Sequence, residues 1–408
     1  MKFIQFLKVA GFALGKLALL MKDALGDITG SSLSFKTDKF LQKDHLADFL
    51  NRHAVSPPVS PIKVTEVSPL DIQSISSNCN NVVFQIDTEA NNKLPDTLFV
   101  KLPSPSFITR WFFSVIGSWE LEVHFFRQVA PRLPIRTPIT YAATSQGSRF
   151  ALIQENLHAD SSVQLFTNLD MLEGPSIELV KRCLDTFAKL HASHFGLSQQ
   201  EREAILPMSH HLFLSQPMKS ISQTLNAQAL GPCIKKQPDI IPDDIIAAYK
   251  KTQAHWDILL EEWFSGPLSL IHGDSHLGNF FVSGEQMGML DFQAVHWGKG
   301  VRDVQYFLID SLPIDVLQEH EQDLLAFYIS RLAAYGVELD FDEAWQQYRG
   351  FTYHTLMTIV VSIGFGAMNE EQDKLMTQIL KRSVAAVQRA DYIGWLDDVI
   401  ASSDVTTE

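Results

Sequence analysis

The stretch of sequence that decides the fold runs from residue 268 to residue 308 and reads LSLIHGDSHLGNFFVSGEQMGMLDFQAVHWGKGVRDVQYFL. Its first apolar residues predict a short strand that leads into a His-Gly-Asp triplet ending at Asp274, and Asn279 follows five residues later. A turn near Gly284 predicts a hairpin whose returning strand reaches Asp291. Because a hairpin joins the two segments, we expect Asp274, Asn279 and Asp291 to face one another.

These three side chains would form an all-oxygen set of two carboxylates and one amide. Such a set suits Mg²⁺, a hard ion that takes one or two protein carboxylates and completes its shell with substrate phosphates. Phosphoryl transfer needs a metal that offsets phosphate charge and a group that orients the acceptor hydroxyl. The pattern therefore predicts Asp274 as the catalytic group, which accepts or orients the hydroxyl proton, and Asn279 and Asp291 as metal ligands.

Composition limits the kinds of protein that this chain can be. With 408 residues, of which 46% are hydrophobic and 20% charged, the chain has enough apolar material for more than one domain. The chain has 33 Lys and Arg against 47 Asp and Glu, a net charge of −14, which argues against a nucleic-acid or anionic-membrane partner. Three scattered cysteines and no CxxC pair exclude a disulfide framework and a zinc site, and they predict a reduced, cytoplasmic setting.

The first 21 residues, MKFIQFLKVAGFALGKLALLM, are strongly apolar. Lys8 and Lys16 interrupt the run, so it lacks the roughly 18 uncharged residues that a membrane span needs. The narrow polar stripe instead predicts an amphipathic helix. Two alternatives stay open: the helix packs on the body of the protein, or residues 1–22 make a peripheral contact with a membrane or a partner.

The rest of the chain changes from strand-like to helical patterns near residue 156. Short β-branched and aromatic runs predict a small antiparallel sheet over 62–67, 82–87, 97–102, 139–143 and 150–154. Helical periodicity then predominates over 177–194, 245–263, 316–335, 341–364 and 370–396. We therefore expect an α+β protein with two lobes and a cleft between them. The expected divisions are an N-terminal helical extension and linker over 1–61, a β-rich N-lobe over 62–156 and a helical C-lobe over 157–408.

The motif around Asp274 resembles that of the kinase-like small-molecule phosphotransferases, which include aminoglycoside phosphotransferases, choline kinases and ecdysteroid kinase-like proteins. The Glu-x-x-Phe-Phe spacing that begins at Glu122 and the Asp-Phe-Gln at residues 291–293 most resemble the ecdysteroid kinase-like branch. The resemblance implies the two-lobed protein-kinase-like fold, with ATP and Mg²⁺ as cofactors and a small-molecule hydroxyl as acceptor. Only twelve positions separate Asp291 from Asp303, too few for the activation segment of a protein kinase.

The resemblance also implies roles for residues that bind the nucleotide. Lys101 would contact the α- and β-phosphates, and Glu122 would pair with that lysine. The segment LIQENL over 152–157 would be the hinge beside adenine, and its central residues are Gln154, Glu155 and Asn156. The loop over 74–81, SISSNCNN, would cover the phosphates with Asn80 and Asn81, although this family normally has glycines there. Asparagine tolerates left-handed backbone, but the missing glycines keep a second hypothesis open: a nucleotide-binding pseudokinase or membrane-tethered scaffold without turnover.

Neighbouring residues would support the catalytic loop. The resemblance implies that Asp303 fastens the loop, and we expect His272 to be a buried hydrogen-bonding brace. His276 either lies on the surface or touches the acceptor or a phosphate.

The resemblance places the acceptor site in the helical lobe, over roughly 197–235 and after residue 310. Its aromatic residues suit a neutral, lipophilic alcohol better than a polycationic aminoglycoside, which would need converging carboxylates. Whether these aromatics line a pocket or form core stays open at this point. They are Phe213, Trp345, Tyr348, Phe351, Tyr353 and His354.

Overall fold

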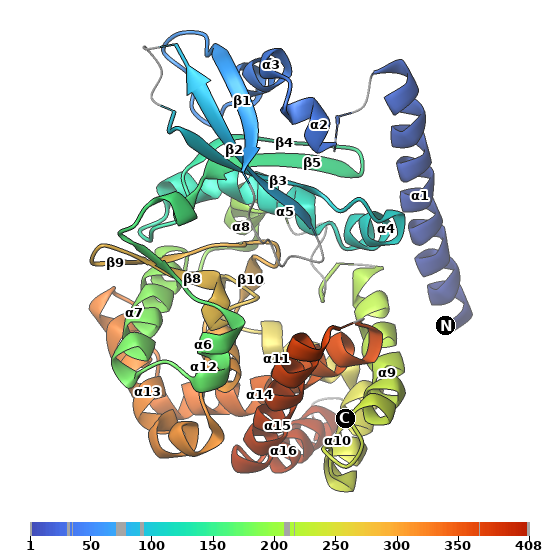
Figure 1. Ribbon diagram of the computed structural model, residues 1–408. Coiled ribbons are helices and arrows are strands. Elements are labelled where there is room, and N and C mark those ends of the chain that lie inside the picture. The colour runs from blue at the N-terminus through green and yellow to red at the C-terminus, as the bar shows by residue number, and fades with distance from the viewer. Residues whose placement is uncertain are drawn as a thin grey trace. The chain divides into compact units, whose positions relative to one another are not determined.

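The structure is a computed structural model that describes residues 2–405 except 31–32, 35, 71–78, 90–93, 208–212, 216 and 367. The chain forms two compact units, which we call the N-terminal unit and the C-terminal unit (Figure 1). The N-terminal unit comprises Met1–Gln164, Ile205–His210 and Leu290–Ala294, and the C-terminal unit comprises Leu165–Ala204, His211–Met289 and Val295–Glu408. The domain boundaries expected from the sequence stay a prediction.

A five-stranded antiparallel sheet in the order β1-β2-β3-β5-β4 forms the centre of the N-terminal unit (Figure 1). Its strands are β1 (Val64–Leu70), β2 (Cys79–Thr88), β3 (Thr97–Pro103), β4 (Thr140–Gln146) and β5 (Arg149–Glu155). Side chains alternate between the two faces of a strand, so Leu98, Val100 and Leu102 of β3 enter the core on one face while Lys101 points to the other. This alternation gives Lys101 its place opposite the main hydrophobic cluster.

Helices cover both faces of this sheet. They are α1 (Lys2–Thr29), α2 (Thr37–Phe40), α3 (Lys43–His53), α4 (Phe107–Ile116) and α5 (Ser118–His124), and the last continues through a π-helical turn, Phe125–Val129, into a 3₁₀ turn, Ala130–Arg132. Leu46, Phe49 and Leu50 of α3 pack into the same cluster as Val100. Glu122 of α5 lies on the opposite face, where it meets Lys101.

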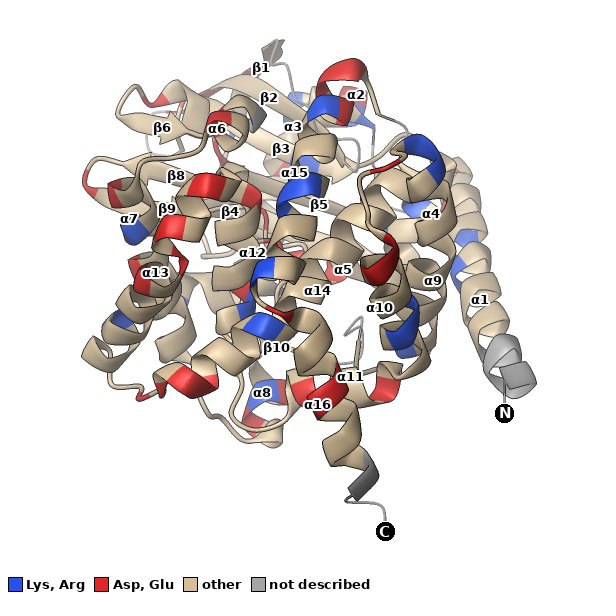
Figure 2. Cartoon of the chain, turned by 90° about the horizontal axis from the view of Figure 1, so that it is seen from below, with Lys and Arg blue, Asp and Glu red and all other residues tan. Residues whose placement is uncertain are grey.

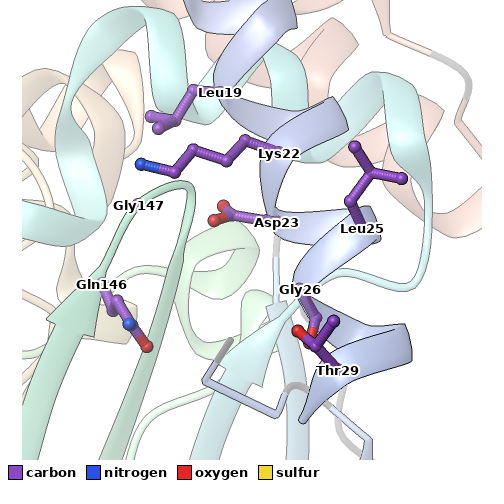
Figure 3. Close-up of a pocket in the computed structure, with 8 residues that line it drawn as sticks. All are labelled: Leu19, Lys22, Asp23, Leu25, Gly26, Thr29, Gln146 and Gly147. Atoms are coloured by element: carbon purple, nitrogen blue, oxygen red, sulfur yellow. The ribbon is translucent and has the colours of Figure 1, made fainter. Parts of the chain in front are cut away.

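The expected N-terminal helix is present as α1, and its C-terminal half is docked on the turn between β4 and β5 (Figure 3). Asp23 is buried and accepts hydrogen bonds from the backbone N–H of Ser148, at 2.6 Å, and from its hydroxyl. Asp27 forms an ion pair with Arg149. Within the described part of the chain, no helix is long and apolar enough to cross a membrane.

The C-terminal unit is mostly helical. Its larger elements are α6 (Asn168–Glu173), α7 (Ile177–Ser193), α8 (Gln199–Ile205), α9 (Met218–Lys236), α10 (Asp243–Ala254), α11 (Trp256–Phe264), α12 (Val301–Ser311), α13 (Ile314–Ala334), α14 (Phe341–Phe365), α15 (Glu370–Arg389) and α16 (Tyr392–Val405). Its short strands are β6 (Val163–Leu165), whose first residues belong to the N-terminal unit, β7 (Ser269–Ile271), β8 (Phe280–Ser283), β9 (Gln286–Met289) and β10 (His296–Gly298). The antiparallel sheet followed by many helices confirms the expected α+β, two-part fold class.

Two of the helices expected from the sequence are each divided in the structure. The segment 245–263 breaks at His255, whose φ of −111° and ψ of 33° are not helical. The segment 370–396 breaks at Asp391, which adopts a left-handed φ of 48° while its carboxylate accepts the N–H of Gly394 at 3.2 Å. Aspartate tolerates this backbone because its short side chain bonds locally, an effect that apolar periodicity does not report.

Candidate active site

A buried lysine forms the centre of the site in the N-terminal unit. Lys101 is 4% exposed, and its Nζ lies 2.8 Å from Oε1 of Glu122 and 3.1 Å from Oδ1 of Asp291. The structure thus contains the Lys101–Glu122 ion pair that the family resemblance implies, and it adds Asp291 as a second anionic partner. The use of this pair to hold phosphates stays a prediction.

The two carboxylates keep Lys101 charged. Burial alone would lower the pKa of Lys101, but the negative charges of Asp291 and Glu122 outweigh burial and raise it. Burial also raises the pKa of Glu122 to about 7, although the lysine opposes that rise. The side chain of Asp291 is 35% exposed, so this carboxylate retains access to solvent while it contacts the lysine. A permanent cation with a partly solvated carboxylate beside it fits a phosphate and its metal ion.

In this unit, the Glu-x-x-Phe-Phe motif packs against the Asp-Phe-Gln segment. The ring of Phe292 stacks on Phe125 with centroids 4.0 Å apart and meets Phe126 edge-on at 5.9 Å. Ser118 at the start of α5 donates a hydrogen bond to the carbonyl of Gln293 at 2.8 Å. Asp291 itself has a left-handed φ of 60°, a strained backbone that persists only where its surroundings hold it. The phenylalanines of the Glu-x-x-Phe-Phe motif therefore hold the Asp-Phe-Gln segment, a contact that sequence reasoning did not anticipate.

The predicted phosphate-covering loop is described only in part, because residues 74–78 lie outside the described residues. Asn80 and Asn81 belong to β2, where Asn81 is directly opposite Lys101 in the register with β3. The amide of Asn80 donates to the hydroxyl of Thr37 at 3.0 Å, whereas Oδ1 of Asn81 is buried and has no hydrogen-bond partner in the described part of the chain. Burial raises the pKa of Cys79 to about 12, so its thiol is neutral.

The side chains of the predicted hinge are engaged in local structure. Gln154 donates to the hydroxyl of Thr140 at 3.0 Å, and Asn156 donates to the hydroxyl of Thr97 at 3.3 Å. Glu155 accepts the backbone N–H of Ile139 at 2.6 Å and pairs with Arg136. Any contact of Gln154, Glu155 and Asn156 with adenine would therefore use their backbone groups, as the resemblance implies, and it stays a prediction.

In the C-terminal unit, an aspartate on α12 fixes the catalytic loop. Asp303 is 1% exposed, and its carboxylate accepts the backbone N–H groups of His272 at 2.6 Å and Gly273 at 2.9 Å. Its Oδ2 also lies 3.3 Å from Nε2 of His191. Burial alone would raise the pKa of Asp303, but the hydrogen bond from His191 and nearby positive charge lower it. The predicted fastening role of Asp303 is confirmed.

The fastened loop presents the carboxylate of Asp274. Its side chain is 45% exposed, Oδ1 accepts a hydrogen bond of 3.4 Å from the Tyr306 hydroxyl, and Oδ2 lies 3.9 Å from Nε2 of His276. His272 is fully buried, and its Nδ1 lies 3.2 Å from the backbone nitrogen of Asp274, whose N–H it accepts. His272 is thus the brace that the sequence predicted, while Asp274 is an accessible carboxylate on a rigid loop.

Asn279 lies in a 3₁₀ turn (Leu277–Asn279) that follows this loop. Its amide nitrogen donates to the carbonyl of Asp274 at 2.7 Å, which leaves its amide oxygen as the group that could bind a cation. Among the residues that the structure describes, no group of three or more His, Cys, Asp or Glu could hold a metal. Taken separately, an amide oxygen and a carboxylate are ligand types that Mg²⁺ accepts, because this ion takes its remaining ligands from water and substrate phosphates, and the joint use of Asn279 and Asp291 stays a prediction.

The comparison with protein families decides the classification. The model of the ecdysteroid kinase-like family matches residues 74–341, which include the Lys101 and Asp274 sites. The chain belongs to the ecdysteroid kinase-like family. The expected membership in this branch is therefore confirmed.

Individual relatives of this family member are distant. Over 274 residues the chain is 24% identical to the methylthioribose kinase of Geobacillus sp. (strain WCH70), and the alignment covers 63% of each protein. The chain thus spans less than two thirds of that kinase. Among solved structures, a protein provisionally described as an aminoglycoside phosphotransferase from Ralstonia eutropha has a TM-score of 0.49 and 14% identity, covering 88% of this chain and 99% of its own. The Plasmodium vivax ethanolamine kinase has a TM-score of 0.46 and 10% identity, with coverages of 79% and 81%.

Two residues of α12 near Asp274 were missed by the sequence analysis. Tyr306 contacts Asp274 directly, and Asp310 lies close enough for the charge of Asp274 to raise the pKa of Asp310. A signal was present, because Tyr306 and Asp310 follow Asp303 by three and seven residues and so share a helix face with it.

Proposed function

We propose that this member of the ecdysteroid kinase-like family is an ATP-dependent phosphotransferase that moves the γ-phosphate of ATP to a hydroxyl of a small molecule. The observation that carries the proposal is Asp274, a half-exposed carboxylate on a loop that Asp303 pins through two backbone N–H groups. The family match supports the same assignment.

The proposed reaction transfers one phosphoryl group and one proton. The acceptor oxygen forms a bond to the γ-phosphorus, the bond between that phosphorus and the β–γ bridging oxygen breaks, and the hydroxyl proton passes to Asp274. Lys101, held charged by Glu122, would neutralise the phosphates. Asn279 and Asp291 would hold Mg²⁺, which when bound offsets charge on the β- and γ-phosphates. Asn81, opposite Lys101, would face the phosphates with its side chain, whereas Asn80, whose amide binds Thr37 on the other face of the sheet, would contact them only through its backbone. The backbone of 154–156 would meet adenine.

We further propose that the acceptor is a neutral, lipophilic alcohol. Support comes from the family match alone. The aromatic residues that suggested such a pocket are mostly core: Phe213, Tyr348, Phe351, Tyr353 and His354 are each at most 4% exposed. Of the two alternatives that the sequence left open, pocket or core, these five residues therefore belong to the core. Their residue types give no information about the acceptor.

A pseudokinase that binds nucleotide without turnover is the second candidate. The observation in its favour is the segment 74–81, which has no glycine to let backbone amides approach phosphates.

The reduced setting expected for the chain agrees with its three cysteines, which are all free and buried, and we propose a cytoplasmic location.

We also propose that α1 contacts a membrane surface peripherally, through residues 1–22 and the turns that follow. Leu14, Met21, Leu25 and Ile28 form one apolar stripe and are 60–83% exposed. The two acidic residues of α1 are engaged with the N-terminal unit, since Asp23 is buried and Asp27 pairs with Arg149, whereas Lys22 is exposed. Figure 2 shows basic residues along the described part of this helix. An exposed apolar stripe beside lysines suits a lipid surface locally, although the chain as a whole carries a net charge of −14.

A thermal-shift experiment with ATP tests the nucleotide part of the proposal. We expect ATP with Mg²⁺ to raise the melting temperature of the wild type, and Asp291→Asn to reduce that rise. Asp87→Asn, an exposed change on β2, is the matched control. A shift that neither needs Mg²⁺ nor responds to Asp291→Asn would favour the pseudokinase.

A further inference from the structure

A tyrosine on α12 links the catalytic-loop carboxylate to a second, buried carboxyl. The hydroxyl of Tyr306 donates to Oδ1 of Asp274 at 3.4 Å, and Asp310, one helical turn further along α12, lies near enough for its carboxyl to interact with Tyr306. Tyr306 and Asp310 are 7% and 4% exposed, so water does not screen this cluster. Two carboxyl groups, those of Asp274 and Asp310, thus lie near one tyrosine.

The surroundings of Asp310 do not stabilise its side chain in the ionised form. Its Oδ1 has no hydrogen-bond partner among the residues that the structure describes. Arg382 of α15 is near, but its guanidinium donates to backbone carbonyls, those of Met171, Leu172 and Asp310 itself, instead of to the carboxylate. A buried ionised carboxylate without compensating hydrogen bonds is costly, whereas a neutral carboxyl is tolerated.

The charged and titratable groups around Asp310 also favour its neutral, protonated form. Burial raises its pKa, and the charge of Asp274 raises it further, to about 8, although Arg382 and Tyr306 oppose the rise. From α14, His354 contacts the Tyr306 ring, but burial and Arg302 hold the pKa of His354 far below its ordinary value, so it is neutral. Arg302 of α12 offsets the charge of Asp274, and α6 contributes the carbonyls of Met171 and Leu172.

The position of one proton then decides how Asp274 is held. When Asp310 is protonated, its O–H can donate to the Tyr306 oxygen and Tyr306 can donate to Asp274, which leaves a single negative charge, on Asp274. When Asp310 is ionised, both carboxylates compete for the one hydroxyl hydrogen, and Asp274 loses a donor and gains a like charge nearby.

We propose that Asp310 is a positioning residue that acts through Tyr306: as a neutral acid it directs the tyrosine hydroxyl to Asp274 and keeps that carboxylate oriented toward the acceptor hydroxyl. The inference rests on the proposed phosphotransferase function and assigns an acid that neither the sequence motif nor the family match identifies. Asp310 does not touch the acceptor; its effect passes through the hydroxyl of Tyr306.

The pH dependence of kcat tests the proposal in the wild type, Asp310→Asn and Tyr306→Phe. In the wild type kcat should fall above about pH 8, by up to about tenfold per pH unit, to a plateau near the kcat of Tyr306→Phe, because Asp310 ionises there. Asp310→Asn keeps a neutral donor and should remove this alkaline fall while leaving the KM for ATP within about twofold. Tyr306→Phe breaks the link and should remove the fall at a lower kcat. Asp315→Asn, an exposed change on α13, should retain the wild-type profile.

An alkaline fall in Asp310→Asn equal to that of the wild type would overturn the proposal. Equilibrium unfolding of the same proteins gives a readout that needs no acceptor. The wild type should lose stability relative to Asp310→Asn as the pH rises from about 4 to about 8, since the unfolded-state carboxyl ionises near pH 4 whereas the folded one keeps its proton until about pH 8. A difference that stays constant from pH 4 to pH 8 overturns the proposal, even if no acceptor is turned over and the proposed function itself fails.

Discussion

Replacing Asp303 by asparagine should disrupt the catalytic loop and lower the free energy of unfolding, by an amount that follows from the hydrogen bonds lost. Oδ1 of Asp303 accepts the N–H of Gly273, and Oδ2 accepts the N–H of His272 and faces His191. In either orientation of the new amide, its NH₂ group meets a backbone N–H, so at least two buried donors, that N–H and the NH₂ itself, have no acceptor. Each unsatisfied buried donor costs about 1–3 kcal/mol, which predicts a loss of roughly 2–6 kcal/mol in the free energy of unfolding.

Urea unfolding at pH 7, followed by fluorescence, measures this loss. Asp87→Asn, exposed on β2, is the control and should stay within about 0.5 kcal/mol of the wild type. The pKa of Asp303 is lowered in the fold, so its contribution is present above the unfolded pKa near 4 and disappears as the pH falls through the lower folded value. The difference in the free energy of unfolding between wild type and Asp303→Asn should therefore become smaller below about pH 4. A difference under about 0.5 kcal/mol at pH 7 would refute the assigned role of Asp303.

Three further predictions concern the two sites and the first helix. Lys101→Met should weaken ATP binding, measured by calorimetry, and should also destabilise the N-terminal unit because Glu122 and Asp291 lose their shared cation; ATP affinity equal to that of the wild type would contradict the role of Lys101. Asp274→Asn should lower kcat by about 10²–10⁴-fold with ATP affinity nearly unchanged, and an equal loss of both would instead indicate a structural or metal-ligand role. Removal of residues 1–22 should leave nucleotide binding intact and reduce sedimentation with phosphatidylserine vesicles, whereas an unfolded product would show that α1 is needed for the core.

The parts of the site that could be predicted from the sequence are those that a local motif carries. The brace at His272 and the fastening by Asp303 are roles that the family resemblance implies, and in the structure each makes hydrogen bonds to the backbone of the same short segment. Lys101 and Glu122 are 21 residues apart, yet each stands in a motif of its own, and the structure joins them at 2.8 Å. Motif spacing was therefore informative where the chemistry fixes the partner.

Packing between distant segments could not be predicted in this way. The stacking of Phe292 on Phe125 depends on tertiary contacts between residues more than 160 positions apart. The aromatic surplus of α14 was ambiguous, because core and pocket use the same residue types, and the structure buries Tyr348 and Tyr353 completely. The burial of Asp310 likewise depends on how α12 and α15 pack, and no local pattern reports it.

The most direct test of the proposed phosphotransfer is the formation of a phosphorylated product. Wild type and Asp274→Asn would be incubated with ATP and Mg²⁺ and a panel of sterols, other lipophilic alcohols, choline and aminoglycosides, with the products identified by mass. The account predicts a phosphorylated neutral alcohol from the wild type and at least about a hundredfold less from Asp274→Asn. A product that forms equally fast with both proteins, or the absence of any product from the wild type although Mg²⁺ and ATP bind, would contradict it.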